Sequence, residues 1–250
     1  MKIVVAGGNG MVGRHVVAVA EERGHRVVSL SRATGVDLVS GAGLAQQLEA
    51  ADVVIDVTST ATQSAAKSRE FFGGVTRTLL DAEGAVGVPH HVALSIVGSD
   101  RAPFGYYAGK AVQEELVSTG RIPWTILRAT QFHEFAQQMV ERFRFGPVTM
   151  VPTMTSQPVA AREVAGRLVE LAEGEPQGRP ADLAGPEELR MSAMVKAYTA
   201  AQGVRGPVVE IPLPGGFGKA MRDGTTLAGP DAQRGVQTFA QWVDGLRQAR

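Results

Sequence analysis

The sequence predicts an α/β protein in which helices cover both faces of a doubly wound parallel sheet. Short β-branched runs alternate with amphipathic segments of helical length through the first half of the chain. The run at residues 53–57 is apolar on both faces apart from Asp56, as expected for a strand buried between two helical layers. After about residue 145, prolines become frequent and the elements shorter, which indicates a small C-terminal α+β lobe.

The first half should form five or six βα units, which implies right-handed crossovers. Gly24 and Gly120 close the first and third helices, and Pro123 leads into the last strand. Strands are expected at residues 4–7, 26–30, 35–38, 52–57, 91–97 and 124–128. Helices are expected at residues 11–23, 68–83 and 106–119, and in the second half at residues 162–173, 192–202 and 233–247.

The composition is that of one large globular domain. The 250 residues include 25 Lys and Arg and 25 Asp and Glu, and this zero balance gives no support for a nucleic-acid or membrane partner. The chain has no cysteine and its five histidines are scattered, so no metal site is expected. No linker divides the chain, so we expect one domain over residues 1–250, with residues 1–145 as its core and residues 146–250 as its smaller lobe.

Neither a signal peptide nor a membrane span is expected from the sequence. The first strand begins at Ile3, which leaves no room for a signal peptide. No apolar run reaches the length of a membrane span. We therefore expect a cytoplasmic protein, while its oligomeric state stays open.

The most informative motif is Gly7-x-x-Gly10-x-x-Gly13, which lies between the first strand and the first helix. Strand, tight turn and helix are the context of a dinucleotide-binding loop in a Rossmann-type sheet. We expect Gly7 to permit the turn, Gly10 to admit a pyrophosphate, and Gly13 to let the helix pack on the strand. The N-terminus of the helix favours phosphate. The residues of this predicted site are Gly7, Asn9, Gly10, Met11, Val12 and Gly13.

The end of the second strand indicates which cofactor is bound. Residues 29–32 contain no acidic side chain of the kind that binds the adenosine ribose of NAD. Arg32 can instead pair with a 2′-phosphate and Ser31 can donate to it, so we expect NADP(H) to be favoured over NAD(H). Asp37 and Leu38 are candidates for contact with the adenine edge. The alternative is that Arg32 is an ordinary solvated loop residue.

Two hydroxyl residues follow the strand at residues 52–57. Thr58 and Ser59 stand where a cofactor crosses the carboxyl edge of a doubly wound sheet, so both are expected to contact it. Either could equally cap the next helix. The two roles are compatible with each other.

The predicted catalytic residues lie around the third helix. Tyr106 and Lys110 are spaced i, i+4 and share one helical face. A tyrosine beside an ammonium has a lowered pKa, which suits it to exchange a proton. Lys110 can also hold the nicotinamide ribose. Ser95, at the end of the preceding strand, is the expected third donor.

Taken in order, these segments resemble a known family. The glycine motif, the strand end at residues 94–98, Tyr106-x-x-x-Lys110 and the segment at residues 123–132 are similar to those of an atypical short-chain dehydrogenase/reductase of the NmrA-like, NAD(P)H-binding type. This resemblance implies that Thr130 and Gln131 line the nicotinamide pocket. The tandem hydroxyl pair common in catalytic relatives is absent, because Ile96 follows Ser95.

Three functions follow from this interpretation. The first is an NADPH-dependent oxidoreductase that passes a hydride to a small carbonyl, enone or quinone acceptor. The second is a non-enzymatic NADP(H)-binding redox sensor or regulator, since the resemblance includes proteins without a working tyrosine. A sugar-nucleotide epimerase is less favoured, because the short C-terminal lobe offers no evident Arg and Lys cluster for a diphosphate.

Overall fold

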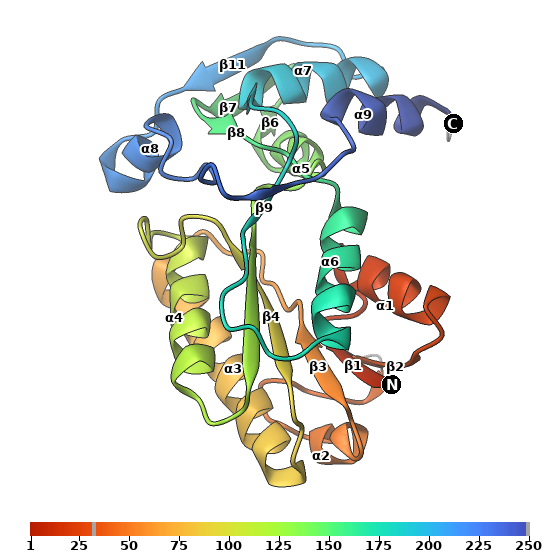
Figure 1. Ribbon diagram of the computed structural model, residues 1–250. Helices are drawn as coiled ribbons and strands as arrows, with labels where there is room; N and C mark the ends of the chain where they lie inside the picture. The colour runs from red at the N-terminus through yellow and green to blue at the C-terminus, as the bar shows by residue number, and fades with distance from the viewer. Residues whose placement is uncertain (32–33, 249–250) are drawn as a thin grey trace. The chain divides into compact units, whose positions relative to one another are not determined.

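The computed structural model describes residues 1–31 and 34–248 (Figure 1). Two compact units can be distinguished within it. Unit 1 comprises Met1–Arg128 and Arg162–Ala181, and unit 2 comprises Ala129–Ala161 and Asp182–Arg250. The expected division after residue 145 therefore differs from the observed one: residues 129–145 group with unit 2, and residues 162–181 return to unit 1.

Unit 1 contains most of the alternating strands and helices, with β5 and α6 each reaching one residue beyond its bounds. Its elements are β1 (Lys2–Ala6), α1 (Gly13–Glu22), β2 (Arg26–Leu30), α2 (Leu44–Leu48), β3 (Val53–Asp56), α3 (Ala65–Val86), β4 (His91–Ile96), α4 (Tyr106–Thr119), β5 (Trp124–Ala129) and α6 (Ala161–Glu173).

Unit 2 is built from shorter elements. These are α5 (Phe135–Phe143), β6 (Arg144–Phe145), β7 (Val148–Pro152), β8 (Thr155–Ser156), β9 (Leu183–Ala184), β10 (Leu189–Arg190), α7 (Met191–Ala201), β11 (Val208–Ile211), α8 (Gly215–Arg222), β12 (Gln233–Arg234) and α9 (Phe239–Gln248). Two small sheets, β11-β7-β6 and β10-β8, belong to this unit.

The main sheet confirms the predicted doubly wound parallel fold. Its strand order is β12-β9-β5-β4-β3-β1-β2. Strand β1 pairs in parallel with both β2 and β3, and β3 pairs in parallel with β4. The chain thus changes direction across the sheet between β1 and β3, and doubly wound sheets bind ligands outside the carboxyl ends of the strands at this switch point.

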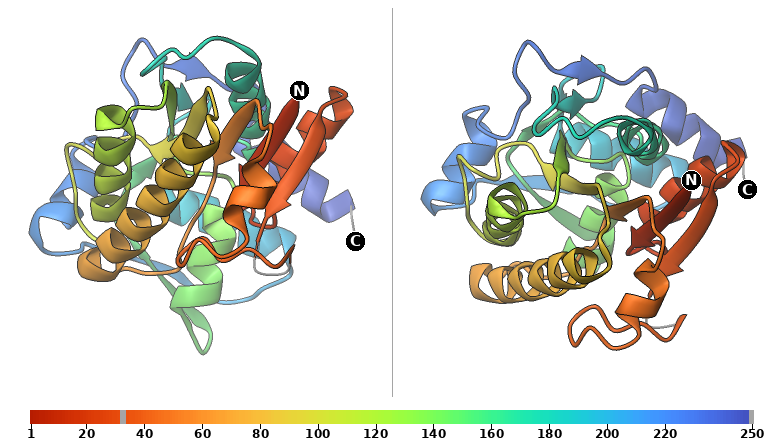
Figure 2. Two further views of the ribbon diagram at one scale, coloured as in Figure 1. Left: turned by 90° about the horizontal axis from the view of Figure 1, so that it is seen from below. Right: turned by 60° about the horizontal axis from the view of Figure 1, so that its bottom comes forward.

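Helices cover both faces of the sheet in unit 1. In the ribbon views α3 and α4 lie side by side on one face, whereas α1 and α6 cover the other (Figure 1, Figure 2). The close approach of α3 and α4 depends on Gly109, because a Cβ there would overlap Ser68 and the ring of Phe72. On the opposite face, Glu173 of α6 accepts from Arg23 and shares a hydrogen bond with His25, each at 2.7 Å.

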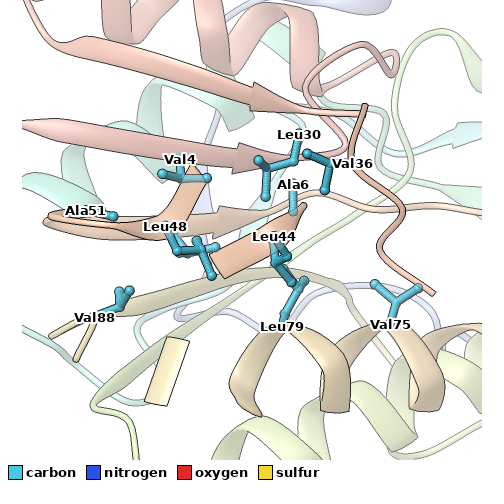
Figure 3. Close-up of a cluster of buried hydrophobic side chains, with 11 residues drawn as sticks. Val4, Ala6, Leu30, Val36, Leu44, Leu48, Ala51, Val75, Leu79 and Val88 are labelled. Atoms are coloured by element: carbon cyan, nitrogen blue, oxygen red, sulfur yellow. The ribbon is translucent and has the colours of Figure 1, made fainter. Parts of the chain in front are cut away.

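An apolar cluster joins the α3 face of the sheet to α2 (Figure 3). Leu44 and Leu48 are spaced i, i+4, so this short helix presents both of them to the strands. Complete burial of a leucine side chain stabilises the fold by roughly 1.5–3 kcal/mol. The cluster consists of Val4, Ala6, Leu30, Val36, Leu44, Leu48, Ala51, Val54, Val75, Leu79 and Val88.

Several expected elements are wrong or were missed. Residues 35–38 form a loop rather than a strand, because the Asp37 carboxylate accepts from the amide of Val39 and the hydroxyl of Ser40 and closes a turn. The last helix begins at Phe239, since residues 233–234 pair with β9 as a strand. Helices α2, α5 and α8 were not expected. None of the helices of the described residues is long and apolar enough to cross a membrane.

Candidate functional site

The glycine loop after β1 is shaped by its lack of side chains. Gly7 has φ = 84°, in the region that favours glycine. A Cβ at Gly13 would overlap the carbonyl oxygen of Gly7 and lie 2.7 Å from Cα of Gly8. The loop and the first turn of α1 are therefore in direct backbone contact, as required for a helix that begins against the strand.

The same loop fits a pyrophosphate. A Cβ at Gly10 would meet only one neighbour within 4 Å, the carbonyl oxygen of Gly7 at 3.1 Å. Within the described part of the chain, no side chain caps the N-terminus of α1, and its first turn holds no acidic residue. The positive end of a helix dipole beside a glycine backbone favours an anion, and binding of a pyrophosphate here stays a prediction. Val12, the residue before α1, is buried, so its side chain belongs to the core rather than to the surface of the loop.

The end of β2 is tied to the loop by side chains. Asn9 Nδ2 donates to Ser31 Oγ at 2.9 Å, and Ser29 Oγ donates to Asn9 Oδ1 at 3.3 Å. The expected phosphate partner Arg32 lies outside the described residues. Asp37 is engaged in its own turn, and the partly buried Leu38 packs against the apolar cluster.

Thr58 and Ser59, which follow β3, differ in exposure and in hydrogen-bond partners. Thr58 is 5% exposed, and its Oγ1 is a buried hydroxyl oxygen with no hydrogen-bond partner among the described residues. Its main-chain N–H donates to Asp56 Oδ1 at 2.9 Å. Ser59 is exposed, and its hydroxyl lies 3.1 Å from the hydroxyl of Tyr106. The hydroxyls of Ser59 and Tyr106 thus form a hydrogen-bonded pair, with Ser59 exposed and Tyr106 partly buried.

The environment of Tyr106 differs from the expected one. Burial raises the pKa of Tyr106 to about 12, although the hydrogen bond with Ser59 opposes this shift and Asp56 adds to it. The prediction that Lys110 lowers the pKa of Tyr106 is therefore wrong in this structure. The tyrosine ring packs edge-on against Phe72, with 5.4 Å between ring centroids. At neutral pH Tyr106 is a protonated, weakly acidic donor.

Lys110 is turned into the protein. Its side chain is buried, and Nζ donates to the carbonyl oxygen of Leu94 at 2.9 Å and to Gln113 Oε1 at 2.8 Å. The ammonium also lies 4.3 Å from the centroid of the Phe72 ring. The other end of the Gln113 amide donates to Asp56 Oδ2 at 2.7 Å, so one buried amide bridges the two charged groups.

The pKa of Lys110 reflects this setting. Burial lowers it to about 8, and the carboxylates of Asp56 and Glu114 oppose the shift. The ammonium is therefore stabilised by charge at a distance rather than by direct contact with a carboxylate. Two of the three ammonium protons are thus used within the protein, and the burial of the side chain, rather than a lack of donors, opposes contact with a ribose.

Ser95 faces a different group from the one expected. Its hydroxyl donates to Glu114 Oε1 at 2.5 Å, and Ser99 donates to the same oxygen at 2.9 Å. Arg128 donates to both oxygens of Glu114, and Arg179 donates to Oε2. A serine has one hydroxyl proton. Ser95 would therefore have to break its bond to Glu114 before it could donate to an acceptor.

In unit 2, Thr130 and Gln131 are buried and bonded. Thr130 Oγ1 donates to the carbonyl oxygen of Gln157 at 2.5 Å and accepts from the amide of Gly185 at 3.3 Å. Gln131 Oε1 accepts from Ser156 at 2.9 Å. These bonds fix the segment that follows β5. The predicted contact of Thr130 and Gln131 with a nicotinamide stays a prediction.

Sequence reasoning missed the polar partners of this site. Gln113 and Glu114 stand three and four residues after Lys110, and one-face spacing could have identified both. Asp56 is the charged member of an otherwise apolar strand, which is a signal of the same kind. Arg179 gave no such signal, because it lies in a loop 65 residues from Glu114.

The loop with Gly7, Gly10 and Gly13 is here called the glycine cradle. Together with the fold, it is typical of a Rossmann-type nucleotide-binding protein. A family model described as NAD(P)H-binding matches residues 7–173. The chain belongs to this NAD(P)H-binding family. Membership supports the binding of a nicotinamide nucleotide but does not separate NADP from NAD. No curated protein is significantly similar to the chain in sequence.

Solved structures share the fold at low identity. MoeE5 in complex with UDP-glucuronic acid and NAD has a TM-score of 0.76 and 16% identity, covering 100% of both chains. A short-chain dehydrogenase/reductase superfamily protein from Agrobacterium tumefaciens, with bound NAD, has a TM-score of 0.67 and 21% identity, covering 100% of this chain and 97% of the other. An NADPH-dependent quinone oxidoreductase from Escherichia coli has a TM-score of 0.67 and 15% identity, covering 98% and 99%.

Proposed function

We propose that this protein is an NADPH-dependent oxidoreductase that reduces a small acceptor, and that a quinone suits its site better than a simple carbonyl. The observation that carries the proposal is the Tyr106–Ser59 hydroxyl pair, which lies in the unit that also holds the glycine cradle. In this proposal the cradle at Gly7, Gly10 and Gly13 holds the pyrophosphate. The bound cofactor supplies a hydride.

The choice of acceptor rests on which protons the chain can deliver. The one proton of Ser95 is donated to Glu114, and Lys110 is buried with Nζ bonded to Gln113 and a main-chain oxygen, so in this proposal Tyr106 is the donor through its bond with Ser59. Its raised pKa makes it a weak acid. Reduction of a carbonyl creates a strongly basic alkoxide that needs a positioned acid. A reduced quinone is a stabilised phenolate that water can protonate, so it depends less on Tyr106.

The same geometry favours one alternative. With Ser95 and Lys110 engaged in the fold, the chain could bind NADP(H) as a sensor and transfer no hydride. Steady-state oxidation of NADPH distinguishes the two functions. We expect turnover with 1,4-naphthoquinone well above the rate without protein, weaker turnover with cyclohexenone, and the weakest with benzaldehyde. Tight NADPH binding without turnover of any of the three would favour the sensor.

The assay needs a control for reaction outside the site. Gly10→Val adds a branched side chain where the pyrophosphate should pass, and within the protein its Cβ meets the carbonyl oxygen of Gly7 at 3.1 Å, so folding is checked by circular dichroism. Turnover that survives in this variant would not arise at the glycine cradle. Turnover that is lost while circular dichroism stays unchanged supports the assignment.

A further inference from the structure

The side chain of Asn9 joins the glycine loop to the end of β2. Its amide donates through Nδ2 to Ser31 Oγ at 2.9 Å and accepts through Oδ1 from Ser29 Oγ at 3.3 Å. The position of Ser29 requires Gly8, because a Cβ at residue 8 would overlap the hydroxyl of Ser29. Two serines on alternate positions of one strand end thus hold both ends of one amide.

This arrangement decides what the Ser31 hydroxyl can do. The main-chain N–H of Ser31 donates to Thr34 Oγ1 at 3.0 Å, and its carbonyl oxygen accepts from the same hydroxyl at 2.8 Å. Ser31 Oγ accepts from Asn9. A hydroxyl has one proton and two lone pairs. Within the described residues no bond uses the proton of Ser31, so the hydroxyl can donate it to a ligand while it accepts from Asn9.

We infer that Asn9 is a specificity-determining residue, which orients the Ser31 hydroxyl as a donor to a phosphomonoester on the 2′ position of the adenosine ribose. The inference rests on the proposed use of NADPH and deepens it. A hydrogen bond to an ionised phosphate is about twice as strong as one to a neutral hydroxyl. A fixed donor at this place therefore favours the 2′-phosphate over the 2′-hydroxyl, without a charge of its own.

Two adenosine probes isolate this contact from the nicotinamide half of the cofactor. Titration calorimetry at fixed salt would compare adenosine 2′,5′-bisphosphate with adenosine 5′-monophosphate. The proteins are the wild type, Asn9→Ala, Ser31→Ala and the double variant. The readout is the ratio of the two affinities in each protein. A charge-assisted hydrogen bond is worth about 1.5–3 kcal/mol, so Ser31→Ala should lower this ratio about ten- to a hundredfold.

The double variant tests whether Asn9 acts through Ser31. Asn9→Ala should lower the ratio about threefold or more in the wild-type background, a part of the Ser31 effect, and leave it unchanged in the Ser31→Ala background. Ser29→Ala, which releases the other end of the amide, should shift the ratio in the same direction by less. A merely structural loop residue would weaken both probes equally.

The outcomes separate the inference from the function on which it rests. Equal binding of both probes by the wild type would mean that the NADPH preference itself is absent. A wild type that prefers the bisphosphate, with Asn9→Ala weakening both probes equally, would overturn the role of Asn9 and leave the preference intact. The role of Asn9 would also be overturned if Asn9→Ala lowered the affinity ratio equally in the wild-type and Ser31→Ala backgrounds.

Discussion

Ser95 donates its hydroxyl proton to the carboxylate of Glu114, with 2.5 Å between Oγ and Oε1. This bond links the end of β4 to α4, and Arg128 links the same carboxylate to β5 at 2.6 Å. Glu114 is thus the charge on which three elements of unit 1 converge. Its burial would raise the pKa, but the hydrogen bonds from Arg128, Ser95 and Arg179 lower the pKa of Glu114 to about 2.

Glu114→Gln should destabilise unit 1 strongly. The substitution removes the buried negative charge and leaves the guanidinium of Arg128, which is 17% exposed in its side chain, without its main partner. Breaking one side of a buried ion pair costs about 3–5 kcal/mol. Urea unfolding should show this loss. Glu115→Gln, on the next residue of the same helix, is the matched control, and an equal loss there would contradict the role of Glu114.

Tyr106→Phe should separate the acceptor classes. The variant keeps the ring that packs on Phe72 and removes the hydroxyl that bonds Ser59. General acid catalysis contributes about 10²–10⁴-fold, so turnover of an aldehyde should fall by that order while NADPH affinity holds. Reduction of a quinone should fall much less.

Tyr107→Phe is the control for this series. Tyr107 is buried and points about 100° away around the helix, so loss of its hydroxyl should leave turnover close to the wild type. A larger defect from Tyr107→Phe than from Tyr106→Phe would show that Tyr107, and not Tyr106, is the proton donor. An unchanged aldehyde rate in Tyr106→Phe would make Tyr106 structural.

Arg32→Ala tests the cofactor preference read from the sequence. Loss of a charge-assisted phosphate pair costs about 1.5–3 kcal/mol, which corresponds to ten- to a hundredfold in NADPH affinity. The affinity for NADH should change little, since NADH lacks the 2′-phosphate. Calorimetry with both cofactors measures the difference. A parallel loss for NADPH and NADH would show that Arg32 does not read the 2′-phosphate.

Sequence patterns within a few residues predicted the helix ends and the glycine turn, because the residues that form these features are neighbours in the sequence. The helix at residues 106–119 was predicted with the observed bounds, because Gly120 marks its end. The loop at Gly7 was predicted from its glycines and its place between the first strand and the first helix, and the φ of 84° at Gly7 gives the physical reason. The strand predicted at residues 35–38 was wrong, because the sequence does not show that the Asp37 carboxylate closes a turn there.

The partners of the site could not be predicted in the same way. Asp56 at the end of β3 and Gln113 of α4 are 57 residues apart in sequence, and only the tertiary fold brings them within hydrogen-bond distance. Lys110 has a side chain long enough to reach either a ribose or the protein interior, and its spacing from Tyr106 does not decide between them. The buried Gln113 amide and the Leu94 carbonyl decide it in the structure.

Two glycine variants should separate folding from binding in the loop. Gly13→Ala places a methyl group on the backbone of Gly7 and Gly8, so it should destabilise the protein and lower its melting temperature. Gly10→Ala meets one atom at 3.1 Å and should fold nearly normally, yet bind NADPH more weakly. Thermal unfolding and NADPH fluorescence titration measure the two effects. The opposite pattern would mean that the roles of Gly10 and Gly13 are reversed.

His91 of β4 and Glu83 of α3 form a buried pair whose stabilising effect should depend on pH. Both side chains are fully buried, with 2.9 Å between His91 Nδ1 and Glu83 Oε2. Burial alone would lower the pKa of His91, but the charge and hydrogen bond of Glu83, together with Asp56, raise it above 6.5. The stabilisation from this pair is complete below the ordinary histidine pKa and is lost as pH rises through the raised value.

The contribution of this pair to the free energy of unfolding should therefore decline as the pH rises above 6.5, and the wild type should lose more stability than His91→Gln between pH 6.5 and pH 8, below the range in which Lys110 titrates. The neighbouring His90 is the control, because burial and the charge of His91 lower its pKa to about 4. Its contribution changes between pH 6.5 and about 4, so His90→Gln should leave the alkaline limb unaltered. Urea unfolding from pH 6 to pH 9 measures all three proteins. If His91→Gln and the wild type decline in parallel above pH 6.5, His91 is neutral in the folded protein and the pair is an uncharged hydrogen bond.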